Sequence, residues 1–135
     1  MPILHGVSVS PYVRKAFVAL TEKSVEFEER IVLPTQIPDD YYKISPLGKI
    51  PCFQDGDFAL ADSSAIIAYL EKAHPETPLC PVEAKEHGRA VWYEEYADTK
   101  LASVLLVPFF EFVVKPKLMG QAPDKARVEK ALGKE

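Results

Sequence analysis

Residues 50–64, IPCFQDGDFALADSS, constrain the fold more than any other part of the chain. Two short apolar runs flank Asp55-Gly56, and an Asp-Gly pair in that position is typical of a tight turn between antiparallel strands. An aspartate and two serines follow at residues 62–64, and such side chains accept hydrogen bonds from the free N–H groups of a helix's first turn. The segment therefore predicts a β-hairpin that leads directly into a helix, which Pro75 ends.

The same segment offers polar groups to a ligand. Pro51 cannot donate to a strand ladder, and a cis bond, which about 5–6% of X-Pro bonds adopt, would expose the backbone N–H and C=O of Ile50 sideways. At the helix start, the N–H groups, the Ser63 hydroxyl and the helix dipole favour a carboxylate, and Asp62 suits an ammonium. Together these groups suit the free amino-acid end of a peptide. The alternative is that Asp62 and Ser63 only cap the helix.

The N-terminal part of the chain predicts a strand, a helix and a second strand. Residues 2–7 form a short apolar run, and Ser10 before Pro11 is typical of a helix N-cap followed by the first helical position. Residues 25–33 alternate in part and stop at Pro34. Two strands joined by a helix usually run parallel. The helix is expected to bury Val13, Phe17, Val18 and Leu20, and to expose Arg14, Lys15 and Lys23.

The remaining chain completes one domain and begins another. A weakly helical loop at residues 35–48 gives the order β-α-β-α-β-β-α for an α/β domain at residues 1–76, and prolines mark a linker at residues 77–82. Residues 83–135 predict the start of an all-helical domain, whose long first helix is kinked at Pro108 and ends at Gly120. This domain looks incomplete, so we expect either a fragment or a short form that covers the helix by association.

Composition argues against several functions. The 135 residues carry a net charge of −4 with dispersed basic residues, which disfavours binding to nucleic acid or to an acidic membrane. With no long apolar run and no leader at Met1, we expect a cytoplasmic protein. Cys52 and Cys80 lack C-x-x-C spacing and suit a reducing compartment. The histidines are scattered at positions 5, 74 and 87, so no metal site is predicted.

Three motifs carry a resemblance to a known family: SPYVRK at residues 10–15, SPLGKIP at residues 45–51 and DSSAI at residues 62–66. On these motifs the chain resembles the glutathione transferase family, in particular a bacterial member of its serine-type, theta- and phi-like branches. The resemblance covers residues 1–80, and the long helix that follows looks like the first helix of the family's second domain. It implies a thioredoxin-like N-terminal domain followed by a helical one.

The resemblance also implies how glutathione is bound. The backbone of Ile50, with Pro51 cis, pairs with the cysteinyl part of the tripeptide. Asp62 holds the ammonium and Ser63 the carboxylate of its γ-glutamyl end, and Lys49 is a partner for the glycine carboxylate. Glutathione is then a co-substrate, and neither a metal nor another cofactor is expected.

A serine at the start of the first helix contacts the glutathione sulfur in the branches that this chain resembles, which gives that role to Ser10. One hydroxyl donating to a thiolate contributes about 1.5–3 kcal/mol and lowers a thiol pKa of about 8.5 by about one to two. Ser10 is thus a hydrogen-bond donor and not a covalent nucleophile. Ser8 and Tyr12 are rivals for the sulfur contact, and the alternative is that Ser10 is only an N-cap.

The leading hypothesis is an enzyme of detoxification that conjugates glutathione to a small apolar electrophile, or reduces an organic hydroperoxide with it. Phe109, Phe110 and Phe112 are candidates to line the electrophile pocket, although aromatic residues at helical spacing are more often core. A second possibility is a non-catalytic interaction module resembling the stringent starvation protein or the γ subunit of elongation factor one. A disulfide reductase would need a cysteine in place of Ser10. The family resemblance also implies a homodimer.

Overall fold

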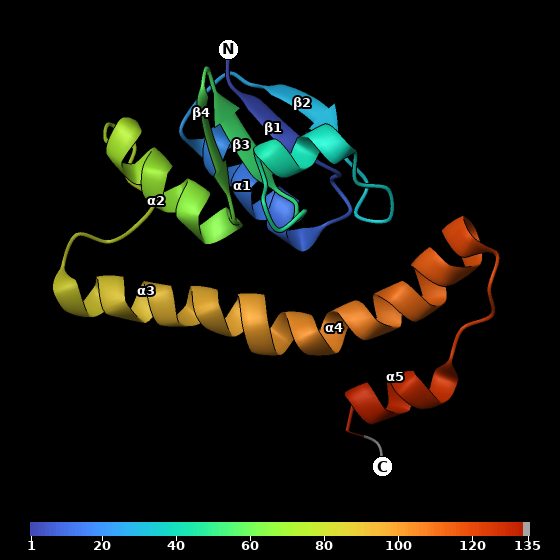
Figure 1. Cartoon of the computed structure of the whole chain (residues 1–135). Helices are drawn as coiled ribbons and strands as arrows, with labels where there is room; N and C mark the ends of the chain where they lie inside the picture. The colour runs from blue at the N-terminus through green and yellow to red at the C-terminus, as the bar shows by residue number, and fades with distance from the viewer. Residues whose placement is uncertain (134–135) are drawn as a thin grey trace. The chain divides into compact units, whose positions relative to one another are not determined.

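The computed structural model of the chain describes residues 1–133. It divides into two compact units, Met1–Val82 and a second unit that begins at Glu83 (Figure 1). In chain order, the elements of the first unit are β1 (Ile3–Gly6), α1 (Pro11–Glu22), β2 (Glu28–Ile31), the 3-10 helix η1 (Asp39–Lys43), β3 (Cys52–Asp55), β4 (Phe58–Ala61) and α2 (Ser63–Ala73).

These strands form one sheet in the order β2-β1-β3-β4. β1 runs parallel to β2 and antiparallel to β3, and β3 and β4 form the predicted hairpin. Helices α1 and α2 pack against each other and cover one face of the sheet, with η1 on the other face (Figure 1). This arrangement is thioredoxin-like, as the resemblance implies. The core under α1 and α2 consists of Leu4, Val13, Ala16, Ala19, Leu20, Phe53, Ile66 and Leu70.

The hairpin turn lies one residue further along than the Asp-Gly pair predicts. Asp55 pairs with Phe58 as the last pair of the ladder, so the two central residues of the turn are Gly56 and Asp57. Gly56 has φ +60 and Asp57 has no positive φ, as in a type II′ turn, which takes glycine first. At the other side of the sheet, β2 is shorter than the predicted strand, and its exposed residues are typical of an edge strand.

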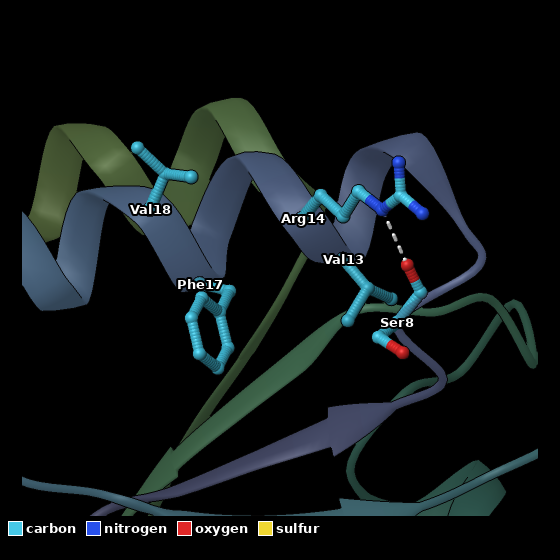
Figure 2. Close-up of a pocket in the computed structure, with 5 residues that line it drawn as sticks. All are labelled: Ser8, Val13, Arg14, Phe17 and Val18. Atoms are coloured by element: carbon cyan, nitrogen blue, oxygen red, sulfur yellow. Dashed lines mark hydrogen bonds between the residues drawn. The ribbon is translucent and has the colours of Figure 1, made fainter.

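Helix α1 buries a narrower stripe than its sequence predicts. Ser10 caps it and Val13 is buried, as expected, but Phe17 and Val18 are 36% and 55% exposed, so the expectation that they face the core is wrong. The positions that face the sheet and α2 instead include two alanines, Ala16 and Ala19. Small side chains let α1 approach its neighbours closely, and that close approach leaves no room for an aromatic ring. Phe17 and Val18 instead line an open pocket along α1 (Figure 2).

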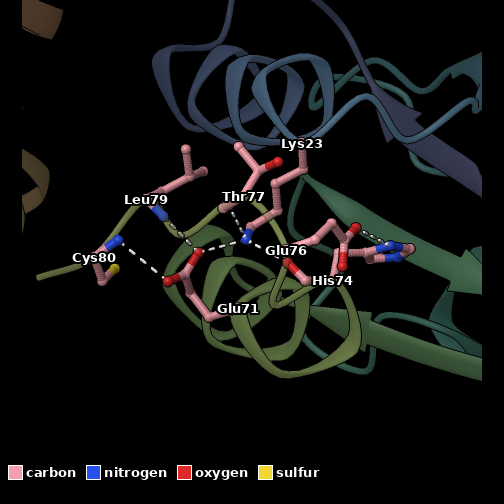
Figure 3. A network of polar contacts seen from close by, with 7 residues as sticks. All are labelled: Lys23, Glu71, His74, Glu76, Thr77, Leu79 and Cys80. Carbon is pink, nitrogen blue, oxygen red and sulfur yellow. Dashed lines mark hydrogen bonds and ion pairs between the residues drawn. The ribbon is translucent and has the colours of Figure 1, made fainter. Parts of the chain in front are cut away.

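Lys23 was also expected outside, and this too is wrong, because it is 3% exposed at the end of α1. Its position continues the buried stripe of the helix, and three acceptors satisfy its ammonium group. Nζ lies 2.7 Å from Glu71 Oε1 and donates to the carbonyl oxygens of His74 and Thr77 at 2.9 and 2.8 Å (Figure 3). A lysine carries three donors, so this burial leaves none of them unsatisfied.

Glu71 extends this network to the segment after α2. Its carboxylate accepts hydrogen bonds from the backbone N–H groups of Leu79 and Cys80 at 3.0 and 3.1 Å (Figure 3). Residues 77–82, expected as a linker, therefore belong to the first unit and are fixed to its helices.

The second unit begins with a continuous helical segment that spans Ala84 to Met119, as predicted. Pro108 lies inside this segment without ending it, Gly120 ends it with φ +63, and Asp124 caps the last helix. Within residues 1–133, no helix is both long enough and apolar enough to cross a membrane. The elements are α3 (Ala84–Tyr96), the π-helical η2 (Ala97–Leu101), α4 (Ala102–Phe109), the π-helical η3 (Phe110–Met119) and α5 (Lys125–Ala131).

A buried carboxylate, Glu111, attaches α5 to the long helical segment. It accepts hydrogen bonds from the Asp124 N–H at 2.8 Å and from Arg127 at 2.7 Å, and it pairs with Lys115 at 2.7 Å. The hydrogen bonds from Lys115, from Asp124 and from Arg127 together lower the pKa of Glu111 to about 2 although burial opposes this. We therefore expect the Glu111 carboxylate to remain ionised, and with it these contacts to α5 to be retained, well below neutral pH.

We expect Glu71→Gln to destabilise the protein at neutral pH. Burial raises the pKa of Glu71, but the hydrogen bonds from Lys23, Leu79 and Cys80 outweigh it, so the pKa lies below 4.5. A depressed pKa contributes stability that is present above about pH 5 and is lost as the pH falls through the folded-state pKa. In thermal unfolding, the difference in Tm between wild type and variant should be largest at pH 7 and shrink toward pH 3.

Glu76→Gln is the matched control. Glu76 is exposed, and its contact is a long one, with 3.7 Å between its Oε1 and His74 Nδ1. This substitution should leave Tm unchanged within a degree or so. A Glu71→Gln variant with the Tm of wild type at pH 7 would contradict a stabilising role for the network.

Candidate functional site

Strand pairing brings three parts of the chain to one end of the sheet. Cys52, the first residue of β3, pairs with His5 of β1 and with Ala61 of β4. The segments that continue beyond these residues are the β1–α1 loop, the dipeptide Ile50-Pro51 and the start of α2. They therefore meet at the same end of the sheet, and they contain the residues for which the sequence predicts a ligand site.

The backbone at Ile50 is presented there without a partner. The Ile50-Pro51 peptide bond is cis, and Pro51 is fully buried. Within residues 1–133, neither the N–H nor the C=O of Ile50 makes a hydrogen bond. Nearly all buried backbone polar groups in proteins are paired, so a free donor and a free acceptor on one residue at a sheet end are available to pair with an extended ligand.

Asp62 and Ser63 begin α2 beside this dipeptide. Asp62 is exposed and is the N-cap, with Oδ1 accepting from the Ser64 N–H at 2.9 Å. The capping alternative is therefore realised, but the second carboxylate oxygen of Asp62 remains for another donor. Asp62 also has φ +81, which is uncommon for a residue with a side chain and occurs preferentially at functional sites.

Ser63 is buried as the first residue of α2, where its N–H has no acceptor inside the helix. An N–H group and a hydroxyl at the positive end of a helix dipole suit an anion. Asp62 and Ser63 thus offer adjacent groups of opposite preference, one for a cation and one for a carboxylate.

The β1–α1 loop contributes hydroxyl groups. Ser10 is half-buried, and its Oγ accepts from the Val13 N–H at 3.4 Å. Capping uses a lone pair of the hydroxyl oxygen, so the Ser10 O–H can still donate a hydrogen bond. Ser8 is exposed and Tyr12 is half-buried in the same region.

Arg14 is exposed, as expected, and it also holds this loop by a contact that the sequence did not predict. Its Nε donates to the Ser8 carbonyl oxygen at 2.7 Å (Figure 2). The same two residues, with Val13, Phe17 and Val18, line a mostly apolar pocket of about 320 Å³. Ser8 is therefore the only predicted site residue that lines it.

Lys49 and three phenylalanines of the second unit are the remaining candidates from the sequence. Lys49 is exposed next to Ile50. Phe109 and Phe110 are half-buried and Phe112 is exposed, and the Arg127 guanidinium lies 5.7 Å from the Phe110 ring centre.

Cys52 and His5, the buried cysteine and the buried histidine, are not arranged as reactive groups. Cys52 is buried, and burial raises the pKa of its thiol to about 11. Burial also lowers the pKa of His5, whose Nε2 lies 3.1 Å from Gln54 Oε1, so this imidazole is neutral at physiological pH. Within residues 1–133, no three potential ligands among His, Cys, Asp and Glu side chains are grouped to hold a metal ion.

Comparison with known proteins identifies the class of protein to which this fold and site belong. The sequence profile of the glutathione S-transferase N-terminal domain matches residues 4–78. The chain therefore belongs to the glutathione S-transferase family.

Individual relatives agree with this assignment. The chain is 44% identical over 87 residues to a glutathione S-transferase of Triticum aestivum, covering 64% of this chain and 40% of the relative. It is 34% identical over 137 residues to glutathione S-transferase 3 of Zea mays, covering 94% of this chain and 59% of the relative. A crystal structure of a glutathione S-transferase from Rhodospirillum rubrum superimposes with a TM-score of 0.91 at 26% identity, covering 99% of this chain and 61% of that one. The chain thus spans less than two thirds of the length of each of these proteins.

We expect Gly6→Ala to destabilise the first unit, because Gly6 ends β1 with φ +151 and a Cβ there would lie 2.5 Å from Val13 Cγ2. The clash and the unfavourable φ together should lower the free energy of unfolding by about 2–4 kcal/mol, measured by urea denaturation. The control is Gly56→Ala, which has φ +60 but no atom within 4 Å of the added Cβ. It should cost only about 1–2 kcal/mol, and equal losses would contradict the role of the contact with Val13.

We expect Cys52 to be unreactive in the folded protein. In a Cys80→Ser background, the remaining thiol should react with Ellman's reagent at least about a hundredfold more slowly than the same protein in denaturant, because it is buried and has little thiolate. The complementary Cys52→Ser variant, which leaves half-buried Cys80, should react faster. Rapid modification of Cys52 under native conditions would contradict this and would reopen thiol exchange as a function.

Proposed function

We propose that the chain binds glutathione at the end of the sheet where the β1–α1 loop, Ile50-Pro51 and the start of α2 meet. The observation that carries this proposal is the free backbone N–H and C=O of Ile50. They match the C=O and N–H of one extended peptide residue, here the cysteinyl residue of glutathione. Membership of the glutathione S-transferase family supports this choice of ligand.

The two ends of the tripeptide have separate partners in this proposal. The Asp62 carboxylate pairs with the γ-glutamyl ammonium, and the N–H and hydroxyl of Ser63 accommodate the γ-glutamyl carboxylate. Exposed Lys49 is a partner for the glycine carboxylate. This arrangement recognises both charges of the γ-glutamyl group.

Ser10 donates a hydrogen bond from its hydroxyl to the glutathione sulfur and so stabilises the thiolate, as in a serine-type glutathione transferase. The thiol proton leaves to solvent, and the sulfur forms a bond to an electrophilic carbon of a small apolar substrate while the leaving group departs with its electron pair. Reduction of an organic hydroperoxide is the alternative outcome. The same thiolate attacks the terminal oxygen and releases the alcohol, and a second glutathione then converts the sulfenic acid into glutathione disulfide and water. Either reaction serves detoxification and needs no cofactor besides glutathione as co-substrate.

Two further features belong to the proposal. We expect a homodimer, and we expect the protein to act in the cytoplasm. The net charge of −4 and the dispersed basic residues support partners other than nucleic acid or an acidic membrane.

The test is calorimetric titration of glutathione into wild type and variants, with thiolate absorbance followed against pH. Asp62→Ala should weaken binding at least about tenfold, because a charge-assisted hydrogen bond contributes about 1.5–3 kcal/mol. Ser10→Ala should leave binding intact and raise the pKa of the bound thiol by about one to two. Ser8→Ala and Tyr12→Phe, the rival donors, should leave that pKa unchanged.

Asp57→Ala is the control for a lost surface carboxylate, because Asp57 lies in the turn at the opposite end of the hairpin. It should bind glutathione as wild type does. No binding of millimolar glutathione by wild type would instead indicate that the first unit is a non-catalytic interaction module.

A further inference from the structure

Two buried hydroxyl groups converge on a single backbone carbonyl next to the proposed glutathione site. Tyr41 Oη donates to the Lys49 carbonyl oxygen at 2.9 Å, and Ser45 Oγ donates to the same oxygen at 2.8 Å. The Lys49 N–H in turn donates to Ser45 Oγ at 3.2 Å. Tyr41 is 4% exposed and Ser45 is 0% exposed, so neither hydroxyl is there to meet solvent.

These hydrogen bonds fix the direction of the Lys49 carbonyl. A carbonyl oxygen has two lone pairs, and the two hydroxyls occupy both. The two hydroxyl donors are themselves held in place. The Ser45 N–H donates to the Tyr41 carbonyl oxygen at 2.9 Å, and the Tyr41 ring packs against the His5 ring with 5.9 Å between the ring centres. Burial raises the pKa of the Tyr41 hydroxyl, so this group stays protonated and can donate its hydrogen bond.

The Lys49 carbonyl shares a peptide group with the Ile50 N–H. This peptide bond is trans, and a trans peptide is planar, with its C=O and N–H pointing in opposite directions. Fixing the carbonyl toward Tyr41 and Ser45 therefore aims the Ile50 N–H away from them. The same N–H is the one that has no partner within residues 1–133.

We propose that Tyr41 and Ser45 are positioning residues that aim the Ile50 N–H at the cysteinyl carbonyl of glutathione. This inference rests on the proposed function and adds residues outside the predicted site. Neither side chain touches the ligand. They act by holding the donor in its binding direction before the ligand arrives, which lowers the entropic cost of binding.

The test compares two ligands that differ at the group in question. Glutathione has a cysteinyl carbonyl, whereas γ-glutamylcysteamine keeps the γ-glutamyl group, the amide N–H and the thiol but lacks that carbonyl and the glycine attached to it. Both are titrated calorimetrically into wild type, Tyr41→Phe and Ser45→Ala. Tyr41→Phe removes one hydroxyl and keeps the buried ring, so it carries the test even where Ser45→Ala does not fold.

We expect each variant to bind glutathione about threefold to tenfold more weakly than wild type and to bind γ-glutamylcysteamine as wild type does. The control is Tyr42→Phe, a neighbouring tyrosine that is exposed, which should change neither affinity. A general loosening of the site would weaken both ligands by the same factor and would overturn the positioning role, as would unchanged glutathione affinity in both variants. Wild-type protein that binds neither ligand would overturn the proposed function itself.

Discussion

The pairing of β3 between β1 and β4 is the interaction on which the candidate site depends. Because Cys52 pairs on one side with His5 and on the other with Ala61, the segments beyond these three residues must end up together. A shift of one residue in the register would turn every side chain of a strand to the opposite face, so the buried side chains of the sheet also fix the site. The two-residue turn at Gly56-Asp57 sets the register between β3 and β4.

The candidate site combines backbone groups with polar side chains, and neighbouring side chains hold several of these groups in place. Tyr41 and Ser45 hold the peptide group before Ile50, the Asp62 side chain caps α2, and Arg14 holds the loop that carries Ser8. The polar groups at the sheet end are therefore arranged before a ligand binds. The donors and acceptors of the site match a peptide bond and the charges of an amino acid, and this match is the basis of the proposed binding of glutathione.

In both units, a carboxylate paired with a lysine fixes the segment that follows a helix. In the first, the Glu71 carboxylate pairs with buried Lys23 and accepts N–H groups from the chain after α2. In the second, the Glu111 carboxylate pairs with Lys115 and accepts the Asp124 N–H ahead of α5. A carboxylate suits this task because it accepts several hydrogen bonds at once, and removing its partners would leave a buried charge.

Local sequence signals determined the elements of this protein. The hairpin, the caps at Ser10 and Asp62, and the helix end at Gly120 each depend on residues within a few positions of one another, so they could be predicted. The motifs for Ile50 and for the start of α2 were likewise local. Only the tertiary structure decided which side of α1 is buried, because the alanines of α1 gain their role from the approach of α2 and the sheet.

Long-range contacts explain where the prediction from the sequence was wrong or incomplete. Lys23 is buried because Glu71 and two carbonyl oxygens, some fifty positions away, satisfy its three donors. The convergence of Tyr41 and Ser45 on the Lys49 carbonyl also depends on how the η1 segment folds back, which spacing alone does not show. Periodicity and capping are local properties, whereas burial of a charge and the direction of a peptide group are set by partners that only folding brings together.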